Sequence, residues 1–167
     1  MSLLIVFGGL PATGKTTLAR ELARRLAAIH LRVDTIEQSL KAAGLAVGPT
    51  GYVIANALAA DNLVLDRAVV ADCVNPVQAS RNGWRETAFR CAVGLVEIEI
   101  ICSDLAEHRR RAESRITDID GLILPSWDEI TSKSYEPWDR DHFVLDTAGK
   151  SIERLVDELE AHVNRIT

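Results

Sequence analysis

The sequence predicts an α/β protein in which helices cover both faces of a parallel sheet. Two observations carry this prediction. Short apolar runs alternate with helical patterns along the whole chain, and a glycine-rich loop joins the first run to the first helix. The chain has 167 residues, of which 47% are hydrophobic and 26% charged. This size and composition suit one globular domain, so we expect a single domain over residues 1–167.

The first part of the chain contains two strands and two helices. Leu3–Phe7 is an apolar run that suits a buried strand. We expect a helix from Gly14 to about Ile29, because apolar residues recur there at the spacing of one helix face, at Leu18, Leu22, Leu26 and Ile29. A short strand at Leu31–Asp34 and a helix at Thr35–Ala43 follow, and the Gly-Pro pair within Gly44–Gly51 indicates a loop.

The middle of the chain continues the alternation. We expect a helix over Tyr52–Leu65 and a buried third strand at Ala68–Ala71. Residues 75–78 read Asn-Pro-Val-Gln, which is typical of a helix start with asparagine as the N-cap and proline in the first helical position. That helix runs to about Cys91.

The last part of the chain has two further strands. Leu95–Cys102 alternates isoleucine with glutamate and predicts the fourth strand, and Phe143–Leu145 predicts the fifth. Between them lie an arginine-rich helix at Asp104–Ser114, a stretch without a period at 116–125, and a capping box at Ser126–Glu129. The closing helix has an apolar stripe at Ile152, Leu155, Val156, Leu159 and Val163.

A phosphate-binding motif follows the first strand. Gly9, Gly14, Lys15 and Thr16 match the spacing G-x-x-x-x-G-K-[ST]. Backbone N–H groups of such a loop and the following helix N-terminus attract an anion, Lys15 would reach the β- and γ-phosphates, and the Thr16 hydroxyl would ligate Mg²⁺. A plain strand-to-helix turn does not need lysine and threonine at these places. We expect the nucleotide to contact Gly9, Ala12, Thr13, Gly14, Lys15, Thr16 and Thr17.

Two aspartates follow predicted strands, at the edge of a parallel sheet where ligands bind. Asp34 could take the proton of a substrate hydroxyl as a general base, or it could serve as a helix N-cap with Glu37 as its partner. Asp72 has the place of a carboxylate that holds Mg²⁺, and the alternative is a plain polar strand end.

Four arginines precede the stretch without a period. Arg111 and Arg115 are four residues apart and share a helix face, where they could stabilise the charge of a transferred phosphoryl group. The alternative is a solvated face paired with neighbouring glutamates, and this applies more strongly to Arg109 and Arg110. Residues 109–125 would then form an arginine-bearing lid that excludes water from the site.

Weaker candidates surround these residues. Arg81, Trp84 and Arg85 share a helix face and could line an acceptor pocket, although Trp84 fits the core equally well. Residues 37, 38 and 52 could line the same pocket, and residues 135–138 suit packing of the lid against the sheet. Asp146–Gly149 would lie beside a nucleobase or form a plain turn before a helix capped by Ser151.

The overall charge and composition exclude some classes of protein. The net charge of −5 argues against a broad nucleic-acid or membrane surface. No apolar run approaches the length needed to cross a bilayer, and Leu3–Phe7 suits a strand better than a signal sequence. Cys73, Cys91 and Cys102 have no metal-ligand spacing and suit buried thiols, so we expect a cytoplasmic protein.

Taken together, these residues resemble the small P-loop kinases of the adenylate-kinase-like group. The likeness is greatest to predicted AAA-type kinases that share features with polynucleotide 5′-kinase, gluconate kinase and chloramphenicol phosphotransferase. It rests on residues 9–16, Asp34, Asp72, the Arg111/Arg115 pair and Leu145–Thr147. The resemblance implies a three-layer P-loop NTPase fold with a five-stranded parallel sheet in the order 2-3-1-4-5. It also implies ATP and Mg²⁺ as cofactors and transfer to a hydroxyl activated at Asp34.

One position departs from the polynucleotide kinase pattern. Those enzymes have D-x-x-R after the second strand, whereas Asp34 is followed three residues later by Glu37, which would repel an anionic acceptor. We therefore expect a small-molecule kinase, with Lys15, Asp34, Arg111 and Arg115 as catalytic residues and Thr16 and Asp72 as metal ligands. A neutral or cationic acceptor fits Glu37 best, and nucleic acid is disfavoured. A nucleoside or polynucleotide 5′-kinase and an ATP- or GTP-binding regulatory module remain alternatives.

Overall fold

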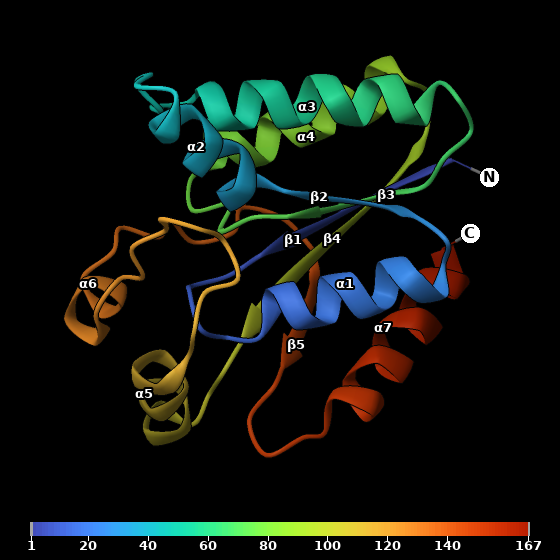
Figure 1. Cartoon of the computed structure of the whole chain (residues 1–167). Helices are drawn as coiled ribbons and strands as arrows, with labels where there is room; N and C mark the ends of the chain where they lie inside the picture. Colours follow the sequence, from blue (N-terminus) through green and yellow to red (C-terminus); the bar gives the residue numbers. More distant parts are fainter. Residues whose placement is uncertain (1, 167) are drawn as a thin grey trace.

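The computed structural model describes residues 2–166 and shows a sheet of five parallel strands between two layers of helices (Figure 1). The strands are β1 (Leu3–Gly8), β2 (Ile29–Arg32), β3 (Val69–Asp72), β4 (Gly94–Ile101) and β5 (Phe143–Asp146). Their order in the sheet is β2-β3-β1-β4-β5. All four pairings are parallel, so the predicted fold class and strand order are confirmed.

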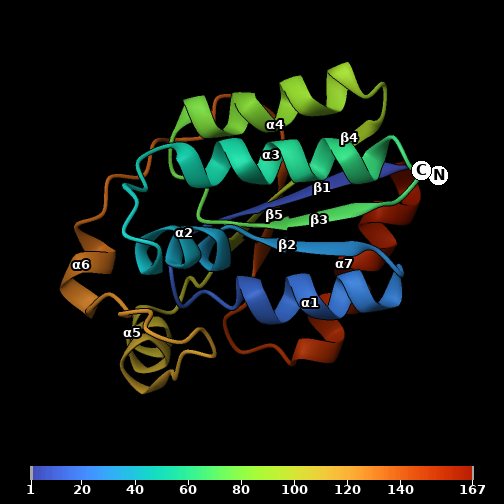
Figure 2. The same ribbon diagram turned by 45° about the horizontal axis from the view of Figure 1, so that its top comes forward.

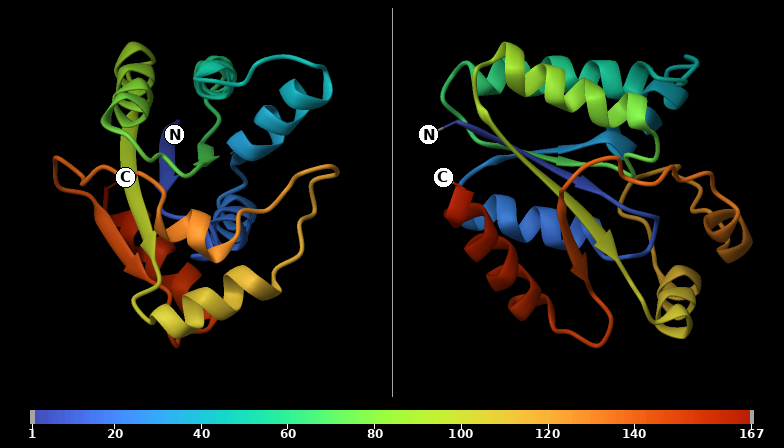
Figure 3. Two further views of the ribbon diagram at one scale, coloured as in Figure 1. Left: turned by 90° about the vertical axis from the view of Figure 1, so that its left-hand side faces the viewer. Right: turned by 180° about the vertical axis from the view of Figure 1, so that it is seen from behind.

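Seven helices connect or follow the described strands. They are α1 (Lys15–Arg25), α2 (Val33–Ala42), α3 (Thr50–Leu63), α4 (Gln78–Arg90), α5 (Leu105–Ser114), α6 (Trp127–Thr131) and α7 (Ile152–Ile166). Helices α3 and α4 cover one face of the sheet, and α1 and α7 cover the other (Figures 1 and 2). Helices α2, α5 and α6 lie toward the carboxyl ends of the strands, whereas the start of β1 and the end of α7 lie together at the opposite end (Figures 1 and 3).

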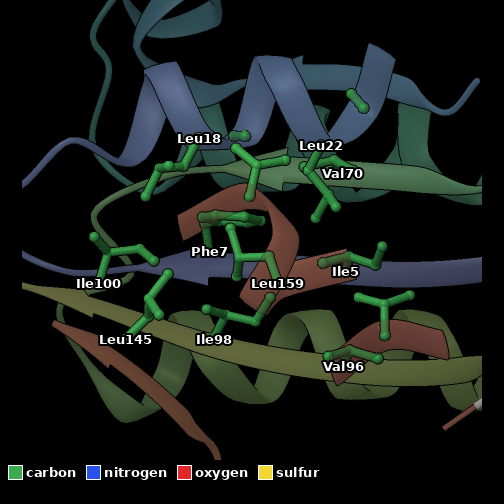
Figure 4. Packing of buried hydrophobic residues seen from close by; sticks show 14 of the residues in the cluster. Ile5, Phe7, Leu18, Leu22, Val70, Val96, Ile98, Ile100, Leu145 and Leu159 are labelled. Atoms are coloured by element: carbon green, nitrogen blue, oxygen red, sulfur yellow. The ribbon is translucent and has the colours of Figure 1, made fainter. Parts of the chain in front are cut away.

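A separate apolar core fills each side of the sheet. On the first side, Ile5 and Phe7 of β1 meet Leu18 and Leu22 of α1 and Leu159 of α7 (Figure 4). On the second side, Leu4 and Val6 pack with buried residues of α3 and α4, among them Trp84. The central strand β1 is buried along its whole length and alternates between these two cores, which explains why its sequence is a continuous apolar run.

The second strand lies two residues earlier than predicted. Helix α1 ends at Arg25 rather than near Ile29, because Ala27 has a left-handed backbone with φ of 50° that turns the chain. Ile29 then opens β2 and pairs with Val69, and Arg32 closes it opposite Asp72. Val33 is buried as the first residue of α2. Asp34 therefore lies in the first turn of a helix and not at a strand end.

The predicted start of α4 is also wrong. Asn75 has a φ of 54°, which is outside the N-cap conformation, and the helix begins at Gln78 with Val77 before it. The Asn75 side chain accepts a hydrogen bond from Ser80 instead, and its backbone N–H donates to the Tyr52 hydroxyl at 2.9 Å. The predicted start of α6 is confirmed, because Ser126 and Glu129 form a complete capping box.

Within residues 2–166, no helix is long and apolar enough to span a membrane.

Candidate active site

The loop between β1 and α1 has the geometry of an anion cradle. Gly9 has a φ of 132°, and a Cβ there would come within 3.0 Å of the Ile100 carbonyl oxygen in β4. Gly14, with a φ of 102°, precedes the first residue of α1, and Ala12 also has a positive φ. These conformations turn the loop around the helix N-terminus, where unpaired N–H groups and the helix dipole attract phosphate.

Lys15 is buried at the base of this loop. Its Nζ donates to the carbonyl oxygen of Leu10 at 2.7 Å, and the Thr13 hydroxyl donates to the same oxygen at 3.0 Å. Burial lowers the pKa of the Lys15 ammonium, and the nearby carboxylates of Asp72 and Asp34 oppose this shift. The ammonium is thus held within the loop by one neutral oxygen, and a bound phosphate would offer it a stronger charged partner.

Asp72, the last residue of β3, is a buried carboxylate with an unsatisfied oxygen. Its Oδ2 has no hydrogen bond, although the His30 Nε2 lies 3.4 Å away and the Arg32 Nε 4.0 Å away. Burial raises its pKa, but His30, Lys15 and the Thr16 hydroxyl together keep the pKa below its ordinary value. An ionised oxygen beside a threonine hydroxyl at a phosphate cradle is a suitable donor set for Mg²⁺.

The residues around Asp72 add two features that the sequence analysis missed. His30 and Arg32 are on β2, and both side chains face Asp72 because β2 pairs with β3 in register. The predicted position of β2, two residues too late, concealed this. Within residues 2–166, histidine, cysteine, aspartate and glutamate side chains nowhere form a group of three or more that could hold a metal ion. Asp72 and Thr16 would therefore share the ion with phosphate oxygens and water.

Asp34 does not cap α2, and its carboxylate lines a cleft at the carboxyl ends of the strands. Arg32 occupies the N-cap position, and no side chain caps this helix, so the predicted capping box of Asp34 and Glu37 is wrong. Both carboxylates line the cleft instead. Burial and the charge of Asp34 raise the pKa of Glu37, while Lys41 and Lys133 oppose that rise. Two lysines of the same cleft wall therefore partly offset the charge of Glu37.

The two paired arginines of α5 have different surroundings. Arg111 is held firmly: its guanidinium donates to the Thr147 hydroxyl at 2.8 Å, to the Thr147 carbonyl at 3.1 Å and to Glu107. Arg115 lines the cleft, and its buried Nε and one terminal nitrogen have no hydrogen-bond partner. Burial lowers the Arg115 pKa, and Asp34 opposes this shift. Arg115 therefore has free donors that an anion in the cleft could use.

Arg109 and Arg110 lie outside the cleft. Arg109 forms an exposed ion pair with Glu113 at 2.7 Å, as the alternative interpretation proposed, and Arg110 is exposed.

Residues 116–125 connect α5 to α6 beyond the carboxyl ends of the strands (Figure 3), and several of them line the cleft. Asp118 in this stretch accepts hydrogen bonds from Arg20 of α1 and from Arg32 at the end of β2, the latter at 2.7 Å. Leu122, Ile123 and Leu124 also contribute to the cleft wall. The sequence offered no periodicity from which these contacts could be predicted.

The weaker pocket candidates have structural roles. Arg81 is fully buried, donates to the carbonyl oxygens of Glu136 and Pro137 at 2.7 and 3.0 Å, and lies over the Trp138 ring. Trp84 is a core residue, and Arg85 pairs with Glu97 at 2.8 Å. The helix face of 81, 84 and 85 therefore ties α4 to residues 135–138 and to β4 and does not line the cleft.

The chain after β5 supports the phosphate loop. The Thr147 hydroxyl is buried and lies 2.9 Å from the Thr13 carbonyl and 3.0 Å from the Ile101 carbonyl. Asp146 accepts hydrogen bonds from the backbone of Ser103 and Ala148. Thr147 thus connects the loop to the end of β4 and holds Arg111 beside it.

The phosphate loop, Asp34, Asp72 and the two paired arginines surround one cleft of about 740 Å³ at the carboxyl ends of β1, β2 and β3. Most of the predicted site residues lie in its wall, namely Ala12, Gly14, Lys15, Thr16, Thr17, Asp34, Asp72, Arg111 and Arg115. Gly9 and Thr13 are not in the wall and support the loop from behind, where the Gly9 N–H donates to the Val74 carbonyl at 3.0 Å.

Known structures with the same fold include several kinases. A gluconokinase from Sinorhizobium meliloti 1021 is 18% identical, with a TM-score of 0.68, and the match covers 96% of this chain and 91% of that one. The APS kinase CysC of Mycobacterium tuberculosis, solved with AMPPNP and APS, is also 18% identical, with a TM-score of 0.69 over 98% of both chains. Kti12 of Chaetomium thermophilum, solved with ADP-AlF3, is 22% identical, with a TM-score of 0.70 over 98% and 99% of the two chains.

A comparison of the sequence with curated proteins gives no significant match. A family model described as an AAA domain matches residues 4–121, which include the phosphate loop, Asp34, Asp72 and both paired arginines. The chain therefore belongs to this AAA-domain family and has the P-loop fold that its sequence resembled.

Proposed function

We propose that the protein is an ATP-dependent phosphotransferase that moves the γ-phosphate to a hydroxyl of a small-molecule acceptor. One observation carries this proposal. A phosphate cradle with its lysine, a free buried arginine and a carboxylate suited to proton abstraction all line the same cleft. A module that only binds a nucleotide needs the cradle, but it has no need of Asp34 or Arg115 around the same space.

The donor would be held by the phosphate loop. Residues 12–17 would contact the phosphates, with Lys15 leaving the Leu10 carbonyl for the β- and γ-phosphates. Mg²⁺, when bound, would neutralise charge on the β- and γ-oxygens. Thr16 and Asp72 would hold that ion, since the Asp72 Oδ2 is ionised, buried and without a hydrogen bond.

Asp34 would act on the acceptor. It lies on α2 and its charge acts on both Lys15 and Arg115, so it shares the space where the transferred group would pass. Its carboxylate would accept the proton of the acceptor hydroxyl as that oxygen attacks the γ-phosphorus.

The two paired arginines would have different tasks. Arg115 would donate to the oxygens of the transferred phosphoryl group, because its buried nitrogens have no other partner. Arg111 would instead fix the wall of the nucleotide site, since Thr147 and Glu107 already occupy its donors. We also propose that residues 109–125 act as a lid that excludes water during transfer, within a single domain over residues 1–167.

The decisive experiment measures ATP consumption with Mg²⁺, with and without hydroxylated acceptors. The panel contains sugars, sugar acids, nucleosides, aminoglycosides and an oligonucleotide with a 5′-hydroxyl, and the Lys15→Ala variant serves as the blank. Strong stimulation by one small-molecule class supports the proposal. Stimulation by the oligonucleotide would favour a polynucleotide kinase. Slow turnover that no acceptor changes, together with a rise in melting temperature on adding ATP, would favour a regulatory module.

With an active acceptor in hand, Asp34→Asn tests the general base. We expect kcat to fall by roughly 10²–10⁴-fold while ATP binding stays the same. The matched control is Asp61→Asn, which removes an exposed carboxylate of α3 outside the cleft. A loss of thermal stability with unchanged kcat would mean that Asp34 only supports the start of α2.

A further inference from the structure

The distribution of lysine in this chain is unusual. The sequence contains four lysines, Lys15, Lys41, Lys133 and Lys150, and all four line the cleft. The cleft wall has 29 of the 167 residues, so an even spread would place fewer than one lysine there. Elsewhere the chain uses arginine for its exposed cations. The lysines are thus concentrated in the wall of the proposed nucleotide site.

The cleft as a whole is basic although the protein is acidic. Its wall contains eight basic residues, the four lysines with Arg20, Arg32, Arg111 and Arg115. Four acidic residues lie in the same wall, Asp34, Glu37, Asp72 and Asp118, so the formal charge of the cleft is +4 while that of the chain is −5. A cleft of one sign concentrates ligands of the opposite sign.

The nucleotide accounts for only part of this charge. From the usual ionisation of phosphate esters, ATP with one Mg²⁺ brings about two net negative charges. Lys15 and Arg115 are the groups placed to meet its phosphates, and Lys150 pairs with Glu158 at 3.2 Å. Arg111 pairs with Glu107, and Arg20 and Arg32 pair with Asp118. Within the described part of the chain, Lys41 and Lys133 are therefore the two cations of the wall that neither the donor nor an ion pair engages.

The remaining cations lie on the acceptor side. Lys41 is on α2, one helical turn after Glu37, and Lys133 follows α6 on the other wall. Both lysines line the same cleft as Glu37, and both act on its charge. Within residues 2–166, neither forms an ion pair within 4 Å, whereas Arg20 and Arg32 are already paired with Asp118. Lys41 and Lys133 are therefore free to bind a ligand.

We propose that the acceptor is a small hydroxylated anion, with a carboxylate or phosphate group that Lys41 and Lys133 bind while its hydroxyl faces Asp34. This inference rests on the proposed function for the hydroxyl but not for the anion site. It reverses the expectation of a neutral or cationic acceptor, which considered Glu37 without the two lysines. A small molecule fits better than a polynucleotide, because two lysines leave no extended basic track for a phosphate backbone.

The first test measures the anion site without any phosphoryl transfer. The phosphate loop is filled with Mg²⁺ and a non-hydrolysable ATP analogue, and inorganic phosphate is titrated by calorimetry. We expect wild-type protein to bind phosphate and the double variant Lys41→Gln/Lys133→Gln to lose at least tenfold in affinity. Arg67→Gln, which removes an exposed cation outside the cleft, should bind as wild type does. Absence of binding, or equal binding by the double variant, would overturn the proposal.

The second test compares matched acceptors: a sugar, its sugar acid and its sugar phosphate. We expect the anionic forms to have the higher kcat/KM, and the acid and phosphate arms show which anion is preferred. In the double variant the KM for the anionic acceptor should rise about tenfold while the KM for ATP stays the same, and Lys41→Arg/Lys133→Arg should restore it. Equal use of the neutral sugar would overturn the anion inference while leaving the kinase proposal intact. Phosphate binding without transfer to any acceptor would support the anion site but would contradict the kinase proposal.

Discussion

At the scale of single residues, the site depends on polar groups that are buried but not fully paired. The Asp72 Oδ2 and two nitrogens of Arg115 lack hydrogen-bond partners, and Lys15 has only a loop carbonyl. Such groups destabilise the protein in the absence of ligand, since each has lost water without a full replacement. Their presence in one cleft indicates that a charged ligand completes them.

Arg115 gives the sharpest prediction at this scale. We expect Arg115→Gln to reduce kcat by about 10²–10³-fold with little change in nucleotide affinity, since in the proposed mechanism its donors would act on the transferred group. Arg109→Gln is the matched control on the same helix, because Arg109 has only an exposed pair with Glu113. Steady-state kinetics and calorimetry with an ATP analogue separate the two effects. A lost affinity with unchanged kcat would assign Arg115 to nucleotide binding.

Glu37 predicts an effect of pH on stability. Burial and the charge of Asp34 raise its pKa in the folded protein, so the fold favours the protonated form. Below the pKa of the unfolded chain this side chain has no electrostatic cost, and as the pH rises its ionisation destabilises the fold. Glu37→Gln should therefore raise the melting temperature by at most a few degrees at pH 7 and leave it unchanged near pH 4. A variant less stable than wild type at pH 7 would show that Lys41 and Lys133 outweigh burial.

At the scale of elements, the sequence predicts helices and strands better than their ends. The five strands and the phosphate loop follow from apolar runs and a motif that have few structural alternatives. The strand order is implied only by the resemblance to P-loop kinases. The end of α1, the bounds of β2 and the start of α4 differ from the predicted ones because the backbone conformation of single residues sets them. Ala27 and Asn75 have positive φ, which no residue type other than glycine signals strongly.

The site residues show the same division. Those of the phosphate loop are set by one local motif, so the sequence is sufficient. The surroundings of Arg111, Arg81 and Asp118 depend on segments that lie far apart in the chain, such as the Thr147 hydroxyl that receives Arg111. A single sequence contains no direct signal for such pairs. The position of Arg109 at the surface could be predicted because its partner, Glu113, is only four residues away in the sequence.

The loop between β1 and α1 allows a test of backbone geometry. Gly9→Ala would place a Cβ against the backbone oxygen of Ile100, which cannot move without disturbing β4. We expect this variant to lose more than about 3 kcal/mol of stability and all nucleotide binding. Gly44→Ala is the matched control, because Gly44 also has a positive φ but open space around it, so it should cost about 1–2 kcal/mol. Equal losses, measured by chemical denaturation, would show that φ alone limits these positions.

At the scale of the whole molecule, the sheet separates a rigid end from an end where chemistry could occur. The apolar cores fill both faces of the strands, and Figure 4 shows the core on the side of α1 and α7. Helices α5 and α6 and the stretch 116–125 lie beyond the carboxyl ends of the strands (Figure 1), and residues of this stretch line the cleft. That stretch is fastened to the rest of the protein by Asp118, which pairs with the half-exposed Arg20 and the largely buried Arg32. None of its residues belongs to either apolar core. It is therefore able to move without disturbing the core.

If the proposed lid closes on the nucleotide, limited proteolysis should detect it. Trypsin can cut after Arg115, where Ile116 is 93% exposed, and also after Arg67, in the exposed turn that follows α3. We expect Mg²⁺ with a non-hydrolysable ATP analogue to slow the cut at Arg115 at least tenfold, since residues 116–125 would close over the bound nucleotide. The cut at Arg67 serves as the internal control, and Lys15→Ala should abolish the protection. Equal slowing at both sites would mean that the nucleotide stabilises the whole fold and that no lid closes. A local closure cannot protect the turn before β3, because that turn lies at the amino end of the strands and the cleft lies at their carboxyl ends.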